Sequence, residues 1–147
     1  MTMRIGTINP FAGLDEIVTE NVPLAPRTWY RIGGPARWFV QPKTVEELQE
    51  AATRCSENDI PIFVLGLGAN LLVSDAGVNG AVFRLDQEFW RRVKFENNIV
   101  EVGAGVDIQK LILRTVRQGL AGIESLAGIP GTIGGGIRMN CGGKFGD

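Results

Sequence analysis

Two glycine-rich segments hold the residues whose types and spacing suit contact with a ligand. The first segment runs Gly66-Leu67-Gly68-Ala69-Asn70-Leu71-Leu72, and the second runs Ile129-Pro130-Gly131-Thr132-Ile133-Gly134-Gly135-Gly136. Two glycines around one residue let successive backbone amides point into the same space, which suits a phosphate or pyrophosphate. Three consecutive glycines leave backbone without side chains, against which a flat ring could lie. The two patterns are typical of contacts to a phosphate group and to a ring.

Neither segment is a complete nucleotide-binding motif. No Gly-Lys-Ser/Thr follows the first segment, and Leu71 stands where a dinucleotide fingerprint has its third glycine. The first segment therefore also fits a simple tight turn. The second also fits a flexible surface loop, although the apolar residues Leu126, Ile129 and Ile137 argue against full exposure.

Several single residues admit two interpretations. Asn140 can bond a ligand amide or carbonyl, or can hold its own turn, and Arg31 can meet an anionic ligand or pack at the surface. Lys144 has the pattern of a solvated lysine more than that of a phosphate ligand. Cys141 has no adjacent base, which favours an inert buried thiol over a nucleophile. For Glu124, the sequence favours a carboxylate that anchors the backbone over one with a functional role.

The composition excludes several other kinds of site. Histidine is absent, which removes His-containing zinc sites and serine–histidine catalysis. Cys55 and Cys141 lack metal-ligand spacing, so no metal is expected, and reduced cysteines fit a cytoplasmic protein. The net charge is −1 without a Lys/Arg run, so nucleic acid is not an expected partner. Residues 62–73 are too few to span a membrane, and residues 1–16 lack a signal-peptide pattern.

Strands and helices must position the two glycine segments. We expect a strand over residues 36–40, a helix from Val45 to about Asn58 capped by Thr44, and a short buried strand over residues 62–65. This order makes a βαβ unit whose strands should be parallel. The first glycine segment then leaves the carboxyl end of a strand, where open α/β sheets bind ligands.

The rest of the chain has a different pattern. Short strands are expected over residues 81–85, 92–95 and 99–102, with a hairpin turn at residues 96–98. Asp107 should cap a second helix that ends near Gly119 and carries on one side Ile108, Leu111, Ile112, Thr115 and Val116. We expect the final 20 residues to form a glycine-rich loop that stops without a closing element, as in a truncated domain.

In this order and spacing, the segments resemble the FAD-binding domain of the UDP-N-acetylenolpyruvoylglucosamine reductase family. The resemblance covers residues 21–147, and it is carried most specifically by Thr28-Trp29-Tyr30-Arg31-Ile32-Gly33-Gly34, residues 65–72 with Asp75, Gly122-Ile123-Glu124, and residues 129–135 with Met139-Asn140 and Gly142. One departure is Ala69, where the family usually has serine.

The resemblance implies an α+β, two-subdomain FAD-binding fold of the vanillyl-alcohol-oxidase (PCMH) type. A small parallel βαβ subdomain would precede a mixed sheet, with residues 1–20 as a loosely docked lead-in and 21–147 as an incomplete FAD-binding domain. Residues 66–72 would hold the FAD pyrophosphate through backbone amides. The isoalloxazine ring would lie along residues 129–135, with the turn formed by Asn140 and Gly142. The family's catalytic residues lie farther along, so no catalytic residue is expected here and this chain alone is expected to be inactive.

The resemblance also implies an activity for the longer protein. NADPH would reduce the flavin, and the enolpyruvyl ether of the UDP-sugar substrate would be reduced to UDP-N-acetylmuramate, a peptidoglycan precursor, in the cytoplasm. Two alternatives remain open at this point. One is an FAD-dependent oxidase of the wider PCMH family, against which the absence of histidine counts because a histidyl-FAD link cannot form. The other is a non-catalytic nucleotide-binding module.

Overall fold

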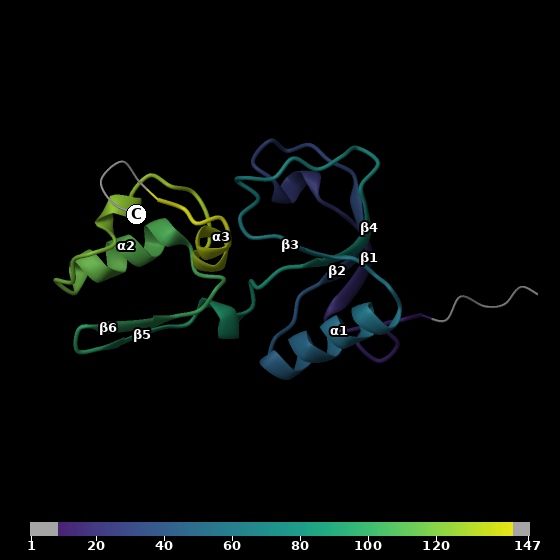
Figure 1. Cartoon of the computed structure of the whole chain (residues 1–147), viewed down its shortest axis with the longest axis horizontal. Helices are drawn as coiled ribbons and strands as arrows, with labels where there is room; N and C mark the ends of the chain where they lie inside the picture. The colour runs from purple at the N-terminus through teal and green to yellow at the C-terminus, as the bar shows by residue number, and fades with distance from the viewer. Residues whose placement is uncertain (1–8, 143–147) are drawn as a thin grey trace, which may run out of the picture.

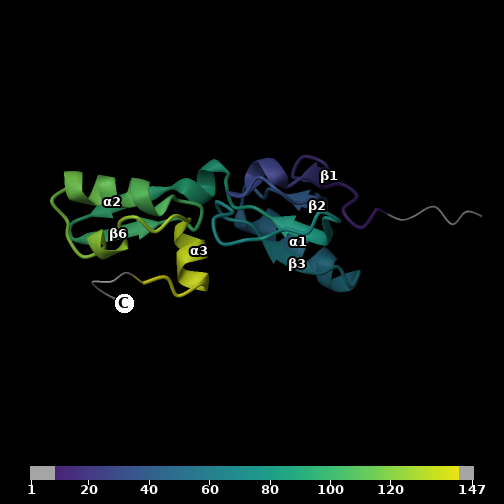
Figure 2. The ribbon, with the colours of Figure 1, turned by 90° about the horizontal axis from the view of Figure 1, so that it is seen from above.

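The computed structural model describes residues 9–142 of the 147-residue chain. Its elements form two groups that lie side by side (Figure 1) and stay separate when seen from above (Figure 2). The first lobe contains β1 (Val18–Pro23), β2 (Pro35–Val40), α1 (Val45–Glu57), β3 (Ile62–Val64) and β4 (Val78–Phe83). The second lobe contains β5 (Val93–Glu96), β6 (Ile99–Val102), α2 (Ile108–Arg117) and α3 (Ile133–Arg138). No helix within residues 9–142 has the length and apolar character needed to cross a membrane.

The first lobe is built on a four-stranded sheet in the order β1-β2-β4-β3. Its strands are β1 (Val18–Pro23), β2 (Pro35–Val40), β3 (Ile62–Val64) and β4 (Val78–Phe83). β1 is antiparallel to β2, whereas β2 and β3 are both parallel to β4. The predicted parallel βαβ unit is therefore confirmed, with β4 inserted between its two strands. β4 begins three residues before the expected strand because Val78 already pairs with Ala36.

Helix α1 (Val45–Glu57) covers one face of this sheet, as the sequence predicts. It begins where the side chain of Thr44 accepts a hydrogen bond of 3.2 Å from the amide of Glu47. The carboxylate of Glu47 reaches back to the amide of Lys43, one residue farther than a capping box requires. Cys55, on the inner side of α1, is fully buried, and burial raises the pKa of its thiol.

Residues 9–20 pack against the first lobe, whereas the sequence predicted a loosely docked lead-in over residues 1–20. Phe11 is only 1% exposed, and its ring meets Trp38 edge-on at 5.7 Å between centroids. β1 begins at Val18 and pairs with β2, so it crosses the boundary expected at residue 20. Where the flavin-binding unit begins remains a prediction.

The strand expected over residues 62–65 is confirmed as β3, but the expectation that it is buried is wrong. β3 lies at the edge of the sheet, and Ile62, Phe63 and Val64 are all exposed. The apolar run is consistent with burial but does not reveal whether a neighbouring strand or helix will cover it. Only Leu65, the residue after β3, is buried, and it packs on the side of the sheet opposite α1.

The second lobe begins with a 3₁₀ turn, Glu88–Arg91, followed by a hairpin of β5 (Val93–Glu96) and β6 (Ile99–Val102). Asn97 takes a left-handed backbone (φ 53°) in the hairpin turn, as predicted. Helix α2 (Ile108–Arg117) begins where the Asp107 carboxylate accepts from the Lys110 amide at 3.1 Å. The predicted apolar face is buried except for Val116, which is 59% exposed.

The prediction of a glycine-rich loop over the final 20 residues is wrong for residues 133–138. Helix α3 (Ile133–Arg138) contains all three consecutive glycines and is capped by the side chain of Thr132. The glycines lower helix propensity, so the sequence argues against a helix at this place. Contacts with the rest of the second lobe override that propensity, as the site geometry shows.

Candidate functional site

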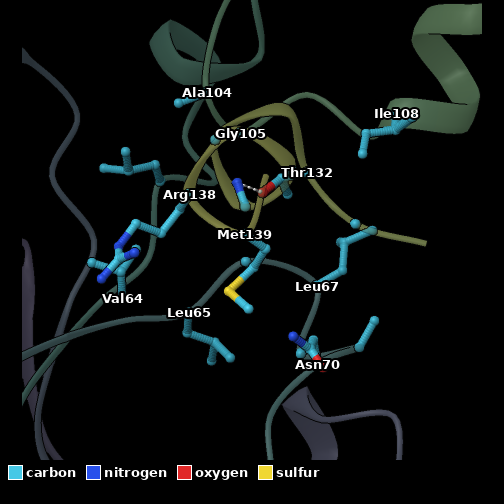
Figure 3. Close-up of a pocket in the computed structure, with 18 of the residues that line it drawn as sticks. Val64, Leu65, Leu67, Asn70, Ala104, Gly105, Ile108, Thr132, Arg138 and Met139 are labelled. Atoms are coloured by element: carbon cyan, nitrogen blue, oxygen red, sulfur yellow. Dashed lines mark hydrogen bonds between the residues drawn. The ribbon is translucent and has the colours of Figure 1, made fainter. Parts of the chain in front are cut away.

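A cavity of about 420 Å³ lies between the two lobes and brings the two glycine segments together (Figure 3). Residues 66–71 line it from the first lobe, and residues 129–132 with Gly134 and Gly135 line it from the second. Its volume falls within the range of about 300–1,000 Å³ that is usual for small-molecule sites. The segments that the sequence assigned to a phosphate and to a ring therefore face one space.

The glycines of residues 66–71 are needed for packing within the protein. A β-carbon on Gly66 would come within 2.8 Å of Thr132 Oγ1. Gly68 has φ +68°, and a β-carbon there would clash with the carbonyl oxygen of Arg27. The amide of Trp29 donates to Gly68 O at 3.1 Å, which holds the segment against residues 27–29. The glycine spacing therefore reflects close approach of protein backbone as well as room for a ligand.

The backbone amides of residues 66–70 are the donors that this loop leaves open. None of them donates a hydrogen bond to an acceptor within residues 9–142. Most backbone N–H groups in folded proteins find a partner, so a run of open amides beside a cavity indicates a place for an anion or for water.

In contrast, the three consecutive glycines of α3 do not have free backbone amides. The expectation that they expose bare backbone amides to a flat ring is therefore wrong. Gly134 N–H donates to Ala104 O at 2.8 Å, Gly135 N–H to Thr132 Oγ1 at 3.1 Å, and Gly136 N–H to Thr132 O at 2.8 Å. A β-carbon on Gly134 would meet Ala104 at 3.0 Å. The glycines let α3 lie closely against neighbouring residues, and Gly134, Gly135 and Gly136 line the cavity without side chains of their own.

Three of the predicted cofactor-binding residues do not line the cavity. Leu72 is 77% exposed, and Asn140 and Gly142 lie outside the lining. Asn140 has φ 47° and donates its amide to Ile137 O at 3.1 Å, so within the described residues it serves the turn that ends α3. Lys144 lies outside the described residues.

The other residues singled out from the sequence sit as follows. Arg31 is exposed away from the cavity, with φ 54°. Glu124 accepts from the Gly122 amide, and hydrogen bonds from its own amide and that of Gly122 lower the pKa of its carboxyl, which confirms the backbone anchor. Cys141 is half-buried at the cavity, where its Sγ lies near Gly136. Within residues 9–142 there is no cluster of three metal-binding side chains.

The charged residues of the cavity are those that sequence reasoning missed, namely Arg84, Asp86, Arg91 and Arg138. Arg84 and Asp86 follow β4 directly, so the rule that placed the first glycine segment at the carboxyl end of β3 could have found them. Arg84 Nε lies 3.2 Å from Asp86 Oδ2, and Asp86 Oδ1 accepts from Gln41 Nε2 at 2.9 Å.

The residues present fit FAD as a bound cofactor. Open amides at residues 66–70 suit its diphosphate, and the glycines of α3 that line the cavity leave room for a flat ring. The cavity is lined mainly by apolar and glycine residues with a few charged groups, which is the usual composition of a cofactor site.

Comparison with known proteins agrees with the assignment of this cavity to FAD. A family model described as "FAD binding domain" matches residues 36–147. UDP-N-acetylenolpyruvoylglucosamine reductase of Anaeromyxobacter sp. (strain Fw109-5) is 45% identical over 88% of this chain and 41% of its own length. The enzyme of the same name from Gloeobacter violaceus is 43% identical over 82% of this chain and 40% of its own length. The chain thus spans less than half the length of these relatives.

Solved structures show the same relationship. UDP-N-acetylenolpyruvylglucosamine reductase from Thermus caldophilus superposes with a TM-score of 0.72 at 40% identity, over 86% of this chain and 44% of that one. A cholesterol oxidase from Brevibacterium sterolicum shares the fold, with a TM-score of 0.66 at 19% identity over 92% of this chain and 26% of that one. The predicted α+β fold of the FAD-binding type is confirmed. The chain therefore belongs to the FAD binding domain family and is similar to the FAD-binding part of UDP-N-acetylenolpyruvoylglucosamine reductases.

Proposed function

We propose that this chain is the FAD-binding part of a longer, NADPH-dependent reductase that converts UDP-N-acetylglucosamine enolpyruvate into UDP-N-acetylmuramate in peptidoglycan precursor synthesis. The observation that supports it most is the meeting of residues 66–71 and residues 129–135 at one cavity, in a chain 45% identical to a reductase of that name. The rest of the longer protein would supply the catalytic residues and the contacts to the UDP-sugar, and the reaction would take place in the cytoplasm.

The residues of this chain would bind and orient the cofactor. The open amides of residues 66–70 would donate to the diphosphate, with Leu72 at the end of that loop. Residues 129–135 would lie along the ring system, together with the turn formed by Asn140 and Gly142. Bound FAD would supply the hydride-transfer chemistry. The close contact of Gly66 with Thr132 would fix the distance between the diphosphate end and the ring end of the site.

The experiment that tests this proposal uses the whole protein loaded with FAD. NADPH oxidation is followed by absorbance in the presence and absence of UDP-N-acetylglucosamine enolpyruvate, and the product is identified by mass spectrometry. The proposal predicts NADPH consumption that depends on the UDP-sugar and a product heavier by two hydrogen atoms. Oxygen consumption that does not depend on the UDP-sugar would instead support an oxidase. A folded protein that binds no flavin would support a nucleotide-binding module without redox chemistry.

A further inference from the structure

The cavity carries more positive than negative charge. Four charged side chains line it: three are arginines (Arg84, Arg91 and Arg138), and one is Asp86. The remaining lining residues are uncharged. The described lining therefore has a formal excess of two positive charges, which equals the two negative charges of a dinucleotide's diphosphate. A mainly apolar cavity strengthens such electrostatic attraction, because its effective dielectric constant is below that of water.

Arg84 is the arginine placed beside the open amides. The register of β3 and β4 pairs Val64 with Phe83, and Leu65 N–H donates to Phe83 O at 2.9 Å. Arg84 therefore lies next to Leu65, directly before the glycine segment. Side chains alternate along a strand, so Arg84 points to the same side of the sheet as Val82, which packs with Leu65.

The guanidinium of Arg84 is oriented by an ion pair, but only part of it interacts with other described residues. The carboxylate of Asp86 forms an ion pair with Nε of Arg84, and it also accepts a hydrogen bond from Gln41 Nε2. Neither Nη group of Arg84 has a hydrogen-bond acceptor within residues 9–142. This arrangement leaves the far edge of the planar group free to donate to an anion, in an orientation that Asp86 sets in advance.

Arg84 also differs from the other two arginines in its surroundings. Its side chain is only 20% exposed, whereas Arg91 and Arg138 are exposed and screened by water. Burial lowers the pKa of Arg84; Asp86 opposes this effect, and the nearby cations Arg27 and Arg91 add to it. A bound anion would offset both the burial and the repulsion.

We propose that Arg84 is the side chain that neutralises the diphosphate of FAD and so makes this cavity select the dinucleotide over riboflavin. This inference rests on the proposed function, since it takes FAD as the ligand. It adds a specificity-determining cation, positioned by Asp86, to the backbone amides of residues 66–70.

The test compares the affinities of FAD and riboflavin for the whole protein by quenching of flavin fluorescence. In Arg84→Gln, FAD should bind at least tenfold more weakly, because a charge-assisted hydrogen bond contributes more than a neutral one. Riboflavin, which has no phosphate, should bind within about twofold of wild type. The affinity for FAD should also fall less steeply with added salt in the variant than in wild type.

Two controls separate charge from structure. Asp86→Asn keeps the cation but weakens the ion pair that orients it, so the preference for FAD should fall less than in Arg84→Gln. Arg37→Gln removes an exposed arginine that hydrogen-bonds to Asn79 outside the cavity, and both flavins should bind as before. Thermal unfolding of each variant without flavin shows whether it folds. If Arg84→Gln does not fold, Arg84→Lys decides, since it should keep the preference for FAD.

The outcomes are distinguishable. Equal weakening of FAD and riboflavin in Arg84→Gln would overturn the inference, as would a loss of the FAD preference in Asp86→Asn as large as that in Arg84→Gln, or its loss in a folded Arg84→Lys. Unchanged FAD affinity in Arg84→Gln would do the same while leaving the proposed function intact. A folded wild-type protein that binds neither flavin would overturn the inference together with the proposed function.

Discussion

Gly66 and Thr132 lie so close together that a β-carbon on Gly66 would come within 2.8 Å of Thr132 Oγ1. The same hydroxyl oxygen accepts from Gly135 N–H and caps α3. One contact therefore joins the loop after β3 to the start of α3 across the cavity, and the geometry of the site depends on it.

Gly66→Ala should destabilise the protein by about 1–3 kcal/mol, because the added methyl group must push Thr132 away. Thr132→Ala should cost about 1 kcal/mol through the lost cap. Since Thr132→Ala removes the atom that clashes, the double variant should lose less stability than the two single effects together. Urea unfolding of the four proteins measures this coupling. Simple additivity would show that the two residues do not touch.

Ala69→Ser adds a hydroxyl at a position that lines the cavity. FAD should bind as tightly as to wild type or up to about fivefold more tightly, because a neutral hydrogen bond contributes about 1 kcal/mol. Fluorescence titration gives the affinity. Weaker binding by tenfold without loss of stability would place the diphosphate elsewhere. Gly68→Val is a poorer probe, since its clash with Arg27 would disturb the loop whether or not a ligand binds.

The two cysteines should react at very different rates with a thiol reagent. Cys55 is fully buried with its pKa raised, so it should react only on unfolding, whereas Cys141 is half-buried at the cavity. Saturating FAD should slow the labelling of Cys141. Mass spectrometry of digested samples follows each site. Labelling of Cys55 in the folded protein at the rate of Cys141 would contradict the packing of α1.

Glu124 should make stability depend on pH in one direction. Hydrogen bonds from the amides of Glu124 and Gly122 lower its folded pKa. The ionised carboxylate thus contributes stability above its unfolded pKa, and that contribution is lost as the pH falls through the folded pKa. Glu124→Gln should therefore be less stable than wild type near neutral pH and equal to it in acid. A difference that grows on acidification would contradict the anchoring role.

Local signals predicted the parts of the fold that are determined locally. Thr44 and Asp107 cap α1 and α2 as their sequences indicate, and Asn97 turns the hairpin. Each of these features depends on residues within a few positions, so a single sequence contains the needed information.

The parts that sequence reasoning missed depend on distant partners. Phe11 is in the core only because Trp38 and α1 meet it there, and its own neighbours show no pattern. Helix α3 forms despite three glycines because Ala104 O and Thr132 accept their amides. β3 is exposed because β4 inserts between it and β2. Arg84 was overlooked because its place in the cavity depends on its position next to Leu65 and on its ion pair with Asp86, which a single arginine in the sequence does not indicate.

The open amides of residues 66–70 should donate hydrogen bonds to the diphosphate of FAD, and the proposed site depends on this contact above all. Amide hydrogen exchange of the protein with and without FAD tests it residue by residue. Without FAD, the amides of residues 66–70 should exchange fast, whereas those of Gly134, Gly135 and Gly136 should already be protected by their acceptors in the protein. Saturation with FAD should slow exchange at residues 66–70. If FAD binds and their exchange is unchanged, the claim is wrong.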